Sequence, residues 1–422
     1  MLYSFAITKT TYAQGTVIDD NFFSVSLDTT RMVDVYLPEG YTQDDTTRHY
    51  PVVYFLHGAK GNQNSYESIE SILNSLISNN SIDPVIMVKP DGSIGPWSGS
   101  MYTNSDLYGL FEEYIVHDLV SYIDSTYNTL KTREKRCIMG HSMGGYGAMK
   151  LALKHPELFG AVAAHSGSLN FIPFLNYIPM VLAENGGSGP FNPDAGTLTN
   201  LMFTMAGAWS PNMNNPPYFV DLFIDNKGLV IDTTWNKWLL QSPAHFATQY
   251  SQQPEVAIYF DCGQQDEFGV FPMNTLFADN LDSLGIPYEF QEYSGTHSNK
   301  LYERFNISLE FLNSKMKSPV TVAYRKNTLP VAFVMHQNYP NPFNSTTIIR
   351  YDLLKPSHVI LKIYDSIGRE VKVLVNNFEE PGFKSVQWNS KNNFGLDVST
   401  GIYMYLIQCD DYSQGGKMIL IK

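Results

Sequence analysis

Serine, aspartate and histidine occur along this chain in an order that could support nucleophilic catalysis. Ser142 lies in the motif G-H-S-M-G (140–144), after the apolar run 137–139 and before a helical pattern at 143–154. A serine hydroxyl is a weak nucleophile unless a histidine takes its proton and an acid orients that histidine. The motif alone is weak evidence, but its place between a strand and a helix indicates a strained turn that exposes the serine. We therefore predict Ser142 as a nucleophile, against the alternative of an inert serine in a tight turn.

The acid and the base are predicted from their order in the chain. In the fold that this motif indicates, the acid follows the serine and the histidine comes last. Asp266 follows the apolar run 256–260, and His297 follows the strand-like segment 288–293. Among ten histidines, only His297 meets this order, and both residues come after strands, where α/β sheets place their sites. Asp261 and Glu267 remain alternatives for the acid, and Asp261 could instead be a structural cap.

Backbone amides must hold the negative oxygen that forms when a serine attacks a carbonyl. Met143 offers one amide directly after the serine. Ala59, in L-H-G-A-K-G (56–61), offers a second one, with Gly58 as the alternative. Because a glycine turn after a buried strand is common, this loop is evidence for an oxyanion site only in combination with Ser142.

Candidate substrate-binding residues flank these positions: His57, Gly58, Trp97, Tyr102 and His141. Trp97 and Tyr102 belong to a polar-aromatic loop that could line an acyl or aryl pocket, although aromatic residues in long loops often pack locally. The sequence has no phosphate-binding loop, nicotinamide fingerprint or metal triad. Its three cysteines lie far apart, without a C-x-x-C pair. The predicted chemistry needs no metal and no organic cofactor.

The elements that must position these residues alternate between strand and helix. Short, continuously apolar runs indicate strands buried on both faces: 52–56, 85–88, 137–139, 161–164 and 256–260. Helical patterns lie at 65–78, 107–126, 143–154, 273–284 and 299–315. This alternation predicts an α/β fold with a doubly wound, mostly parallel sheet, preceded by an antiparallel strand pair. Residues 169–240 interrupt it with a loop-rich insertion, which we predict to be a cap over the site, against the alternative of a peripheral flap.

The remaining segments divide the chain into further parts. Residues 1–20 are predicted to be a signal-peptide remnant or an ordinary flexible arm, and 21–316 the α/β domain. A linker is expected at 317–335. Residues 336–422 alternate short β-runs with turn signals, which predicts a small all-β sandwich.

Composition limits the classes of function. The chain has 422 residues, 28 Lys plus Arg against 41 Asp plus Glu, and a net charge of −13. This charge repels a phosphate backbone, so nucleic-acid binding is not expected. No run of 18 apolar residues occurs, so no transmembrane segment is predicted.

Residues 22–316 resemble the esterase D and feruloyl-esterase group of α/β-hydrolases. The resemblance is carried by VDVYLPEGY, YPVVYFLHGAKG, GHSMGGYGAMKLALKHPELFGAVAAHSG, FDCGQQDEF and SGTHS, and it includes all three predicted triad positions. It implies carboxylic-ester hydrolysis through an acyl-enzyme. The insertion at 169–240 departs from the compact members, so the identity of the substrate does not carry over.

Residues 336–422 resemble the C-terminal sorting domain of the type IX secretion system. QNYPNPFNSTTIIRYDLL, LKIYDSIGREVKVLV, STGIYMYLI and KMILIK carry this resemblance. It implies secretion machinery as a partner and export across the bacterial outer membrane, to the medium or the cell surface.

Together these features predict a secreted serine esterase for feruloyl or acetyl-type esters of polysaccharides, or for other short acyl or aryl esters. Two alternatives remain open at the level of sequence. One is an acyltransferase to a sugar acceptor, and the other is a non-catalytic surface glycan-binding protein on a hydrolase scaffold.

Overall fold

The computed structural model describes residues 14–250, 256–317, 333–335, 338, 341–379, 381–410 and 412–421, and the chain divides into two compact units after Ser318. Residues 1–13 of the predicted arm and 318–332 of the predicted linker lie outside the described residues. Strand β1 begins at Thr16, so the end of the predicted arm is strand, and the last helix of the first unit reaches Lys317.

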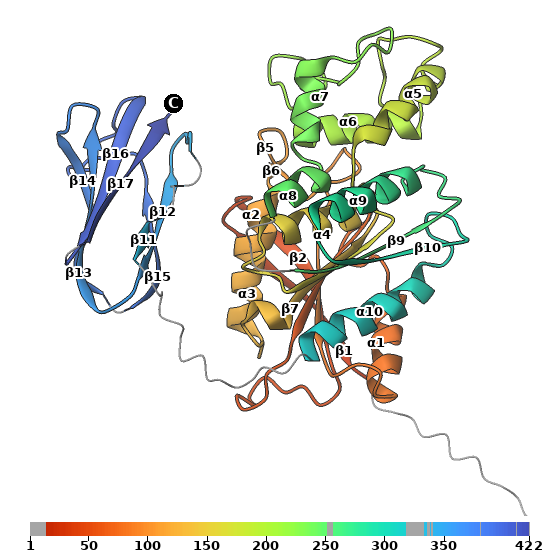
Figure 1. Cartoon of the computed structure of the whole chain (residues 1–422), viewed down its shortest axis with the longest axis horizontal. Helices are drawn as coiled ribbons and strands as arrows, with labels where there is room; N and C mark the ends of the chain where they lie inside the picture. Colours follow the sequence, from red (N-terminus) through yellow and green to blue (C-terminus); the bar gives the residue numbers. More distant parts are fainter. Residues whose placement is uncertain are drawn as a thin grey trace, which may run out of the picture. The chain divides into compact units, whose positions relative to one another are not determined.

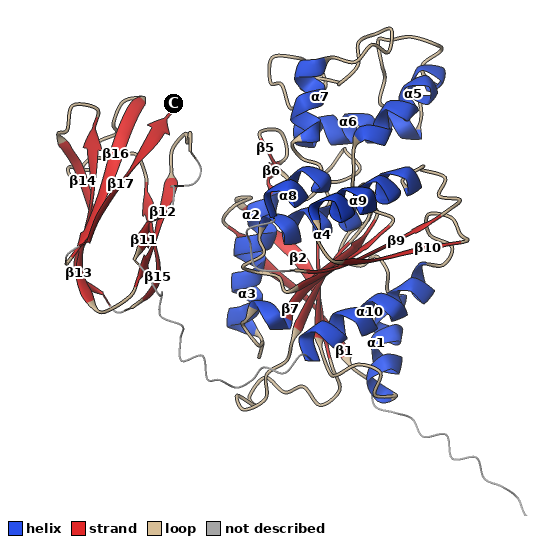
Figure 2. Ribbon diagram, in the orientation of Figure 1, coloured by secondary structure: helices blue, strands red, loops and turns tan. Residues whose placement is uncertain are grey.

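One eight-stranded sheet forms the centre of the first unit (Figure 2). Its strand order is β1-β2-β4-β3-β7-β8-β9-β10. The six strands from β4 to β10 in this order are parallel, and β1 and β2 are antiparallel. The fold class predicted from the sequence is therefore confirmed. The strands are β1 (Thr16–Ser24), β2 (Thr29–Leu37), β3 (Val52–Leu56), β4 (Ile86–Pro90), β7 (Arg136–His141), β8 (Ala161–His165), β9 (Ala257–Gly263) and β10 (Tyr288–Tyr293).

Two layers of helices cover the sheet (Figure 1). Every residue of β3, β4, β7 and β8 is buried, because side chains on both faces of these strands pack against helices. On one face lie α1 (Ser68–Ser78) and α10 (Leu301–Lys317). On the other lie α3 (Val120–Thr126), α4 (Met143–Lys154), α8 (Pro243–Tyr250) and α9 (Phe271–Leu284).

The helix predicted at 107–126 is wrong in its first part. The chain forms a two-stranded ribbon there, β5 (Asn104–Ser105) and β6 (Gly109–Leu110), before the helical turn α2 (Phe111–Glu113). A π-helical segment, η1 (Tyr114–Leu119), then leads into α3. The apolar spacing of 107–126 also fits a regular helix, so the pattern does not reveal this change.

The insertion at 169–240 forms a helical cap beyond α8 and α9 (Figure 1). It contains η3 (Ile172–Tyr177), α5 (Ile178–Glu184), α6 (Thr197–Trp209) and α7 (Asp232–Leu239). Its core is aromatic: the ring centroids of Trp209 and Trp238 are 5.0 Å apart, and that of Tyr146 on α4 is 5.4 Å from Trp209. The cap is therefore packed onto the helix that follows the predicted nucleophile.

The second unit consists of two antiparallel sheets, in the orders β11-β12-β15 and β14-β13-β16-β17, around a core of their own. This all-β organisation agrees with the sequence prediction. The strands are β11 (Val334–Met335), β12 (Thr347–Leu353), β13 (Ser357–Asp365), β14 (Glu370–Glu379), β15 (Gly382–Trp388), β16 (Gly401–Cys409) and β17 (Tyr412–Leu420). Among the described residues of both units, no helix has the length and apolarity that crossing a bilayer requires.

Candidate active site

Ser142 lies on the strained turn between β7 and α4. Its backbone has φ +57° and ψ −117°, a conformation that costs energy for a residue with a side chain. The neighbouring glycines make room for it. A Cβ added to Gly140 would lie 2.4 Å from the carbonyl oxygen of Gly144, and one added to Gly144 would lie 1.9 Å from that of Leu56. Only glycine fits at these two positions, which explains the spacing of the motif.

Asp266 and His297 meet in the loops that follow β9 and β10. Nδ1 of His297 donates a hydrogen bond to Oδ2 of Asp266 at 2.7 Å. The second carboxylate oxygen accepts the backbone N–H of Phe268 at 2.9 Å, and the Asp266 side chain is fully buried. With Nδ1 bound in this way, Nε2 is the ring atom of His297 that remains for a substrate or a nucleophile.

The two alternative acids have other partners. The fully buried carboxylate of Asp261 accepts hydrogen bonds from Nδ1 of His165 and Nε of Arg304, both at 3.0 Å. Oε2 of Glu267 accepts the backbone N–H of His297 at 2.9 Å. Among the described residues, neither carboxylate is hydrogen-bonded to the His297 ring, whereas the predicted acid is.

His141 and Tyr66 support the loop that carries His297. Nε2 of His141 donates to the backbone oxygen of His297 at 3.0 Å, and the Tyr66 hydroxyl donates to Nδ1 of His141 at 2.8 Å. Burial and the neighbouring His297 lower the pKa of His141 to about 3, so this ring stays neutral at ordinary pH. His141 lines the cavity, as predicted for a substrate-binding residue, but its ring nitrogens are occupied by these contacts. No motif in the sequence points to Tyr66.

The candidate oxyanion donors lie beside Ser142. Met143 is the first residue of α4, and the first amides of a helix have no intrahelical acceptor. Ala59 and Gly58 line the same cavity as Ser142. A Cβ added to Gly58 would lie 3.4 Å from the Cβ of Ser142, so this loop closely approaches the predicted nucleophile.

One cavity of about 340 Å³ joins these residues to the cap. Ser142 and His297 both line it, without a hydrogen bond between them among the described residues; such bonds often tighten only when substrate is bound. Thirteen of its 27 lining residues belong to 169–240, the segment that we propose as a cap over the site. Most of these thirteen are apolar: Phe174, Ile178, Val181, Leu198, Leu201, Met202, Met205, Phe223, Ile224 and Trp238.

Three predicted substrate-binding residues are absent from the lining of this cavity. Trp97 stacks on Phe203 of the cap, with ring centroids 6.3 Å apart. The buried hydroxyl of Tyr102 donates to the backbone oxygen of His57 at 3.0 Å. Nε2 of His57 accepts the N–H of Gly92 at 2.8 Å. These side chains shape the surrounding loops, and their assignment as substrate contacts is corrected accordingly.

Comparison with protein families agrees with this geometry. Residues 24–309 match the esterase family model, described as "Putative esterase". The chain belongs to the esterase family. Residues 337–422 match the secretion system C-terminal sorting domain. Among the described residues of this esterase, no group of three or more His, Cys, Asp or Glu side chains is arranged to hold a metal ion.

Relatives of this esterase are distant. An esterase of Mycobacterium tuberculosis is 24% identical over 278 residues, covering 63% of this chain and 52% of that protein. An endo-1,4-beta-xylanase/feruloyl esterase of Xylanibacter ruminicola is 30% identical over 161 residues, covering 36% of this chain and 22% of that one. The chain spans about half the length of the first curated relatives that it matches, and less of the xylanase/feruloyl esterase.

Solved structures share the fold. A ferulic acid esterase has a TM-score of 0.52 at 20% identity, with 72% of this chain and 99% of that one covered. An S-formylglutathione hydrolase from Agrobacterium tumefaciens has a TM-score of 0.50 at 17% identity, with 74% and 99% covered. At these identities the likeness concerns the fold alone.

Proposed function

We propose that this chain is a secreted serine carboxylic-ester hydrolase that works through an acyl-enzyme, with Ser142, His297 and Asp266 as its catalytic triad. One observation carries the proposal. The imidazole of His297 is fixed by Asp266 at 2.7 Å and lines the same cavity as a serine on a strained strand-to-helix turn. This combination supplies the base and the nucleophile that acyl transfer requires.

In the first half of the reaction, Nε2 of His297 takes the proton of the Ser142 hydroxyl as Oγ attacks the ester carbonyl carbon. The amides of Met143 and Ala59 stabilise the resulting oxyanion. The carbon–oxygen bond to the alcohol then breaks, and His297 returns its proton to the leaving oxygen. Asp266 holds the tautomer of the ring and stabilises its positive charge.

In the second half, water releases the acyl group. His297 takes a proton from the water as its oxygen attacks the acyl-enzyme carbonyl, and the same amides hold the oxyanion. The bond to Oγ of Ser142 then breaks, and His297 protonates the serine again. Apart from the ester and water, these steps use only side chains and backbone amides of the chain.

The lining of the cavity favours a substrate with an apolar group on one side of the scissile bond. Its cap wall is formed largely by aliphatic, methionine and aromatic side chains, which bind hydrocarbon surface and offer no counter-charge. Among the proposed feruloyl, acetyl and other short acyl or aryl esters, this favours the aryl and longer acyl ones over acetyl. The polysaccharide or other alcohol then lies toward solvent.

The sorting domain at 337–422 supports export by the type IX secretion system to the medium or the cell surface. Such a location suits a substrate that is too large to enter the cell. We therefore include in the proposal that the acyl group of the substrate is esterified to a plant polysaccharide.

Labelling and kinetics test the nucleophile. A fluorophosphonate should react covalently with Ser142, and Ser142→Ala should abolish the label and lower kcat by about a thousandfold or more. The substrates are p-nitrophenyl esters of rising chain length, methyl ferulate and acetylated xylan. Ser168→Ala is the matched control because Ser168 lines the same cavity on a different loop. Normal turnover by Ser142→Ala would exclude the proposal.

A further inference from the structure

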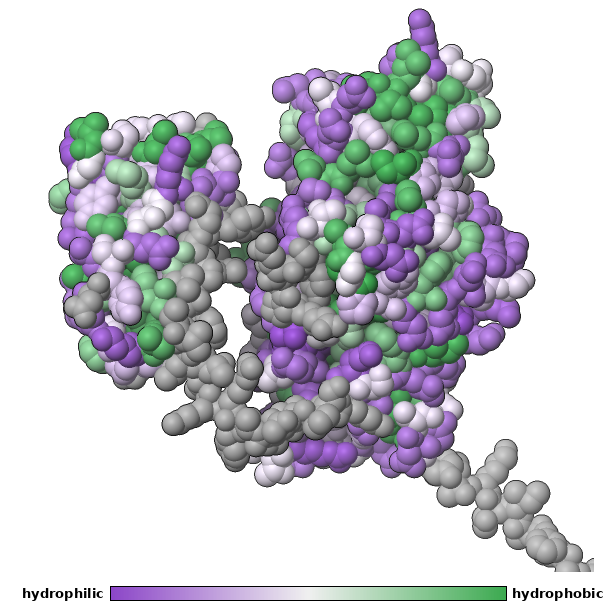
Figure 3. Space-filling model, in the orientation of Figure 1, coloured by the Kyte–Doolittle hydropathy of each residue, from purple (hydrophilic) through white to green (hydrophobic). Residues whose placement is uncertain are grey.

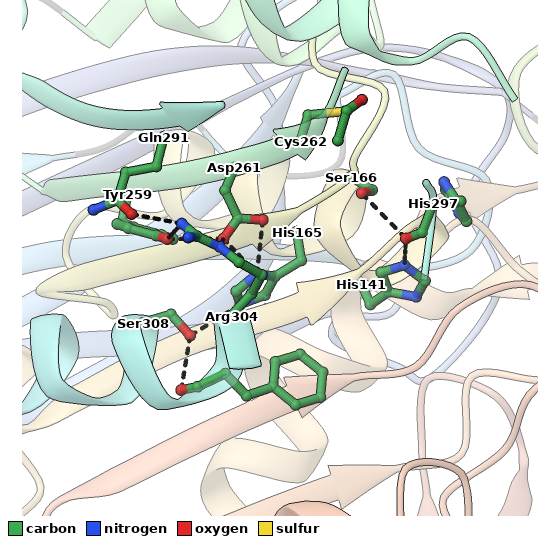
Figure 4. Close-up of polar contacts among 12 residues, drawn as sticks. His141, His165, Ser166, Tyr259, Asp261, Cys262, Gln291, His297, Arg304 and Ser308 are labelled. Carbon is green, nitrogen blue, oxygen red and sulfur yellow. Dashed lines mark hydrogen bonds and ion pairs between the residues drawn. The ribbon is translucent and has the colours of Figure 1, made fainter. Parts of the chain in front are cut away.

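A buried polar network lies under the candidate active site (Figure 4). Its centre is Asp261, at the carboxyl end of β9. One of its carboxylate oxygens accepts hydrogen bonds from His165 Nδ1, Arg304 Nε and the Tyr259 hydroxyl, at 3.0, 3.0 and 2.8 Å. Burial opposes ionisation of this carboxyl, but His165 and Arg304 outweigh it and hold its pKa below the ordinary value. Asp261 is therefore charged and fully paired at neutral pH.

The network reaches Ser142 through His165. Nε2 of this ring contacts Oγ of Ser308 on α10 at 2.9 Å, so β8, β9 and α10 are tied together at one residue. The backbone oxygen of His165 accepts the N–H of Ser142 at 2.8 Å. A shift of His165 thus moves the acceptor that holds the strained turn of the predicted nucleophile.

The network reaches His297 through Arg304. Nη2 of Arg304 donates to Oε1 of Gln291 on β10 at 2.6 Å, and the guanidinium lies 5.0 Å from the ring centroid of Tyr293. Tyr293 ends β10 four residues before His297, and α10 begins four residues after it. Arg304 therefore ties both ends of the His297 loop to Asp261.

A third link joins the same elements through Ser166. Its backbone N–H donates to the carbonyl oxygen of Asp261 at 2.9 Å, and its hydroxyl donates to the carbonyl oxygen of His297 at 3.4 Å. Figure 4 shows Ser166 between the buried network and His297.

Ser308, His165 and Asp261 are hydrogen-bonded in the same order as the serine, histidine and aspartate of a catalytic triad. They do not form a second active site. All three are fully buried, and none of them lines the cavity of Ser142. Substrate has no access to Oγ of Ser308, so the arrangement acts on structure.

We propose that Asp261 is a positioning residue which, through His165 and Arg304, fixes the Ser142 turn and the His297 loop at the spacing that proton transfer requires. This inference rests on the proposed function. Small displacements of reacting groups are costly, since a misplacement of about 1 Å lowers a rate by about 100-fold. A loosened network should therefore lower kcat and leave the apolar cavity, and with it KM, little changed.

The test uses the full chain with Asp261→Asn, which keeps the shape of the side chain and removes its charge. Arg304→Lys is the second variant: it keeps the charge but loses the two-sided contact to Asp261 and Gln291. For each, kcat and KM on a p-nitrophenyl ester and the rate of fluorophosphonate labelling of Ser142 are measured. We expect kcat and the labelling rate to fall by about 10- to 100-fold, with KM within about threefold of wild type.

Asp124→Asn is the matched control. It removes the charge of another largely buried ion pair, Arg136 Nη2 to Asp124 Oδ2 at 2.5 Å, at the amino end of the central strand β7. It should lower the thermal midpoint and leave kcat unchanged, because Asp124 contacts neither the Ser142 turn nor the His297 loop. If Asp261→Asn and Arg304→Lys fold and keep wild-type kcat and labelling rates, the inference is wrong.

Hydrogen exchange separates this failure from failure of the proposed function. The amide of Ser142 should exchange faster in Asp261→Asn and Arg304→Lys than in wild type and Asp124→Asn, whether or not the protein turns over an ester. Unchanged exchange there contradicts the positioning role. Absence of a label on Ser142 in the wild-type chain contradicts the proposed function.

Discussion

Asp266 and Glu267 are neighbours in the chain, but they contact different atoms of His297. Asp266 holds the ring, and Glu267 accepts the backbone N–H. Asp266→Asn keeps the shape but permits the wrong tautomer of His297, so we expect kcat to fall by about 10³- to 10⁴-fold. Glu267→Gln retains an acceptor for the backbone and should cost less than about tenfold. Steady-state kinetics of both variants on one ester measure the difference.

An equal loss of kcat in both variants would contradict the assignment of the acid. The order of residue types in the chain predicted Ser142 and His297 as candidates and limited the acid to three carboxylates. It could not choose among the carboxylates, because the turn at 263–266 decides which one faces the ring. For the same reason Trp97 and Tyr102 were assigned wrongly: a sequence shows that a side chain lies near a motif, not where it points.

The cap is the element most closely linked to specificity. Leu201 on α6 lines the cavity and is only half-buried, so a larger side chain can enter the cavity without disrupting the cap core. Leu201→Trp should lower kcat/KM for octanoyl relative to acetyl esters by about tenfold or more, because the loss of a single methylene contact in an apolar pocket already costs about tenfold. A p-nitrophenyl ester series measures this ratio.

Met180→Trp is the control, since Met180 on α5 is half exposed and does not line the cavity. Met180 is one of the exposed apolar side chains of the cap. Figure 3 shows hydrophobic patches in green on the surface of the cap. An unchanged octanoyl-to-acetyl ratio in Leu201→Trp, or an equal change in Met180→Trp, would contradict a role of the cavity in chain-length selection.

Elements were predicted best where the sequence pattern had one interpretation. Continuously apolar runs such as 52–56 became parallel strands, because only burial on both faces accommodates such a run. The aromatic segment 104–119 had no such signal, and there a ribbon and a π-helical segment replaced the expected helix. The cap was predicted as a region, but its helices came from tertiary packing among aromatic rings that local pattern does not encode.

Among the described residues, each of the two units has buried apolar clusters of its own, and every residue of the candidate active site belongs to the first unit. A domain with its own core can fold alone. A chain that ends at Ser318 should therefore keep kcat/KM within about twofold of the full chain, and calorimetry should show one cooperative transition for it and two for the full chain. Loss of activity in the shorter chain, with the fold intact by circular dichroism, would mean that the second unit contributes to catalysis.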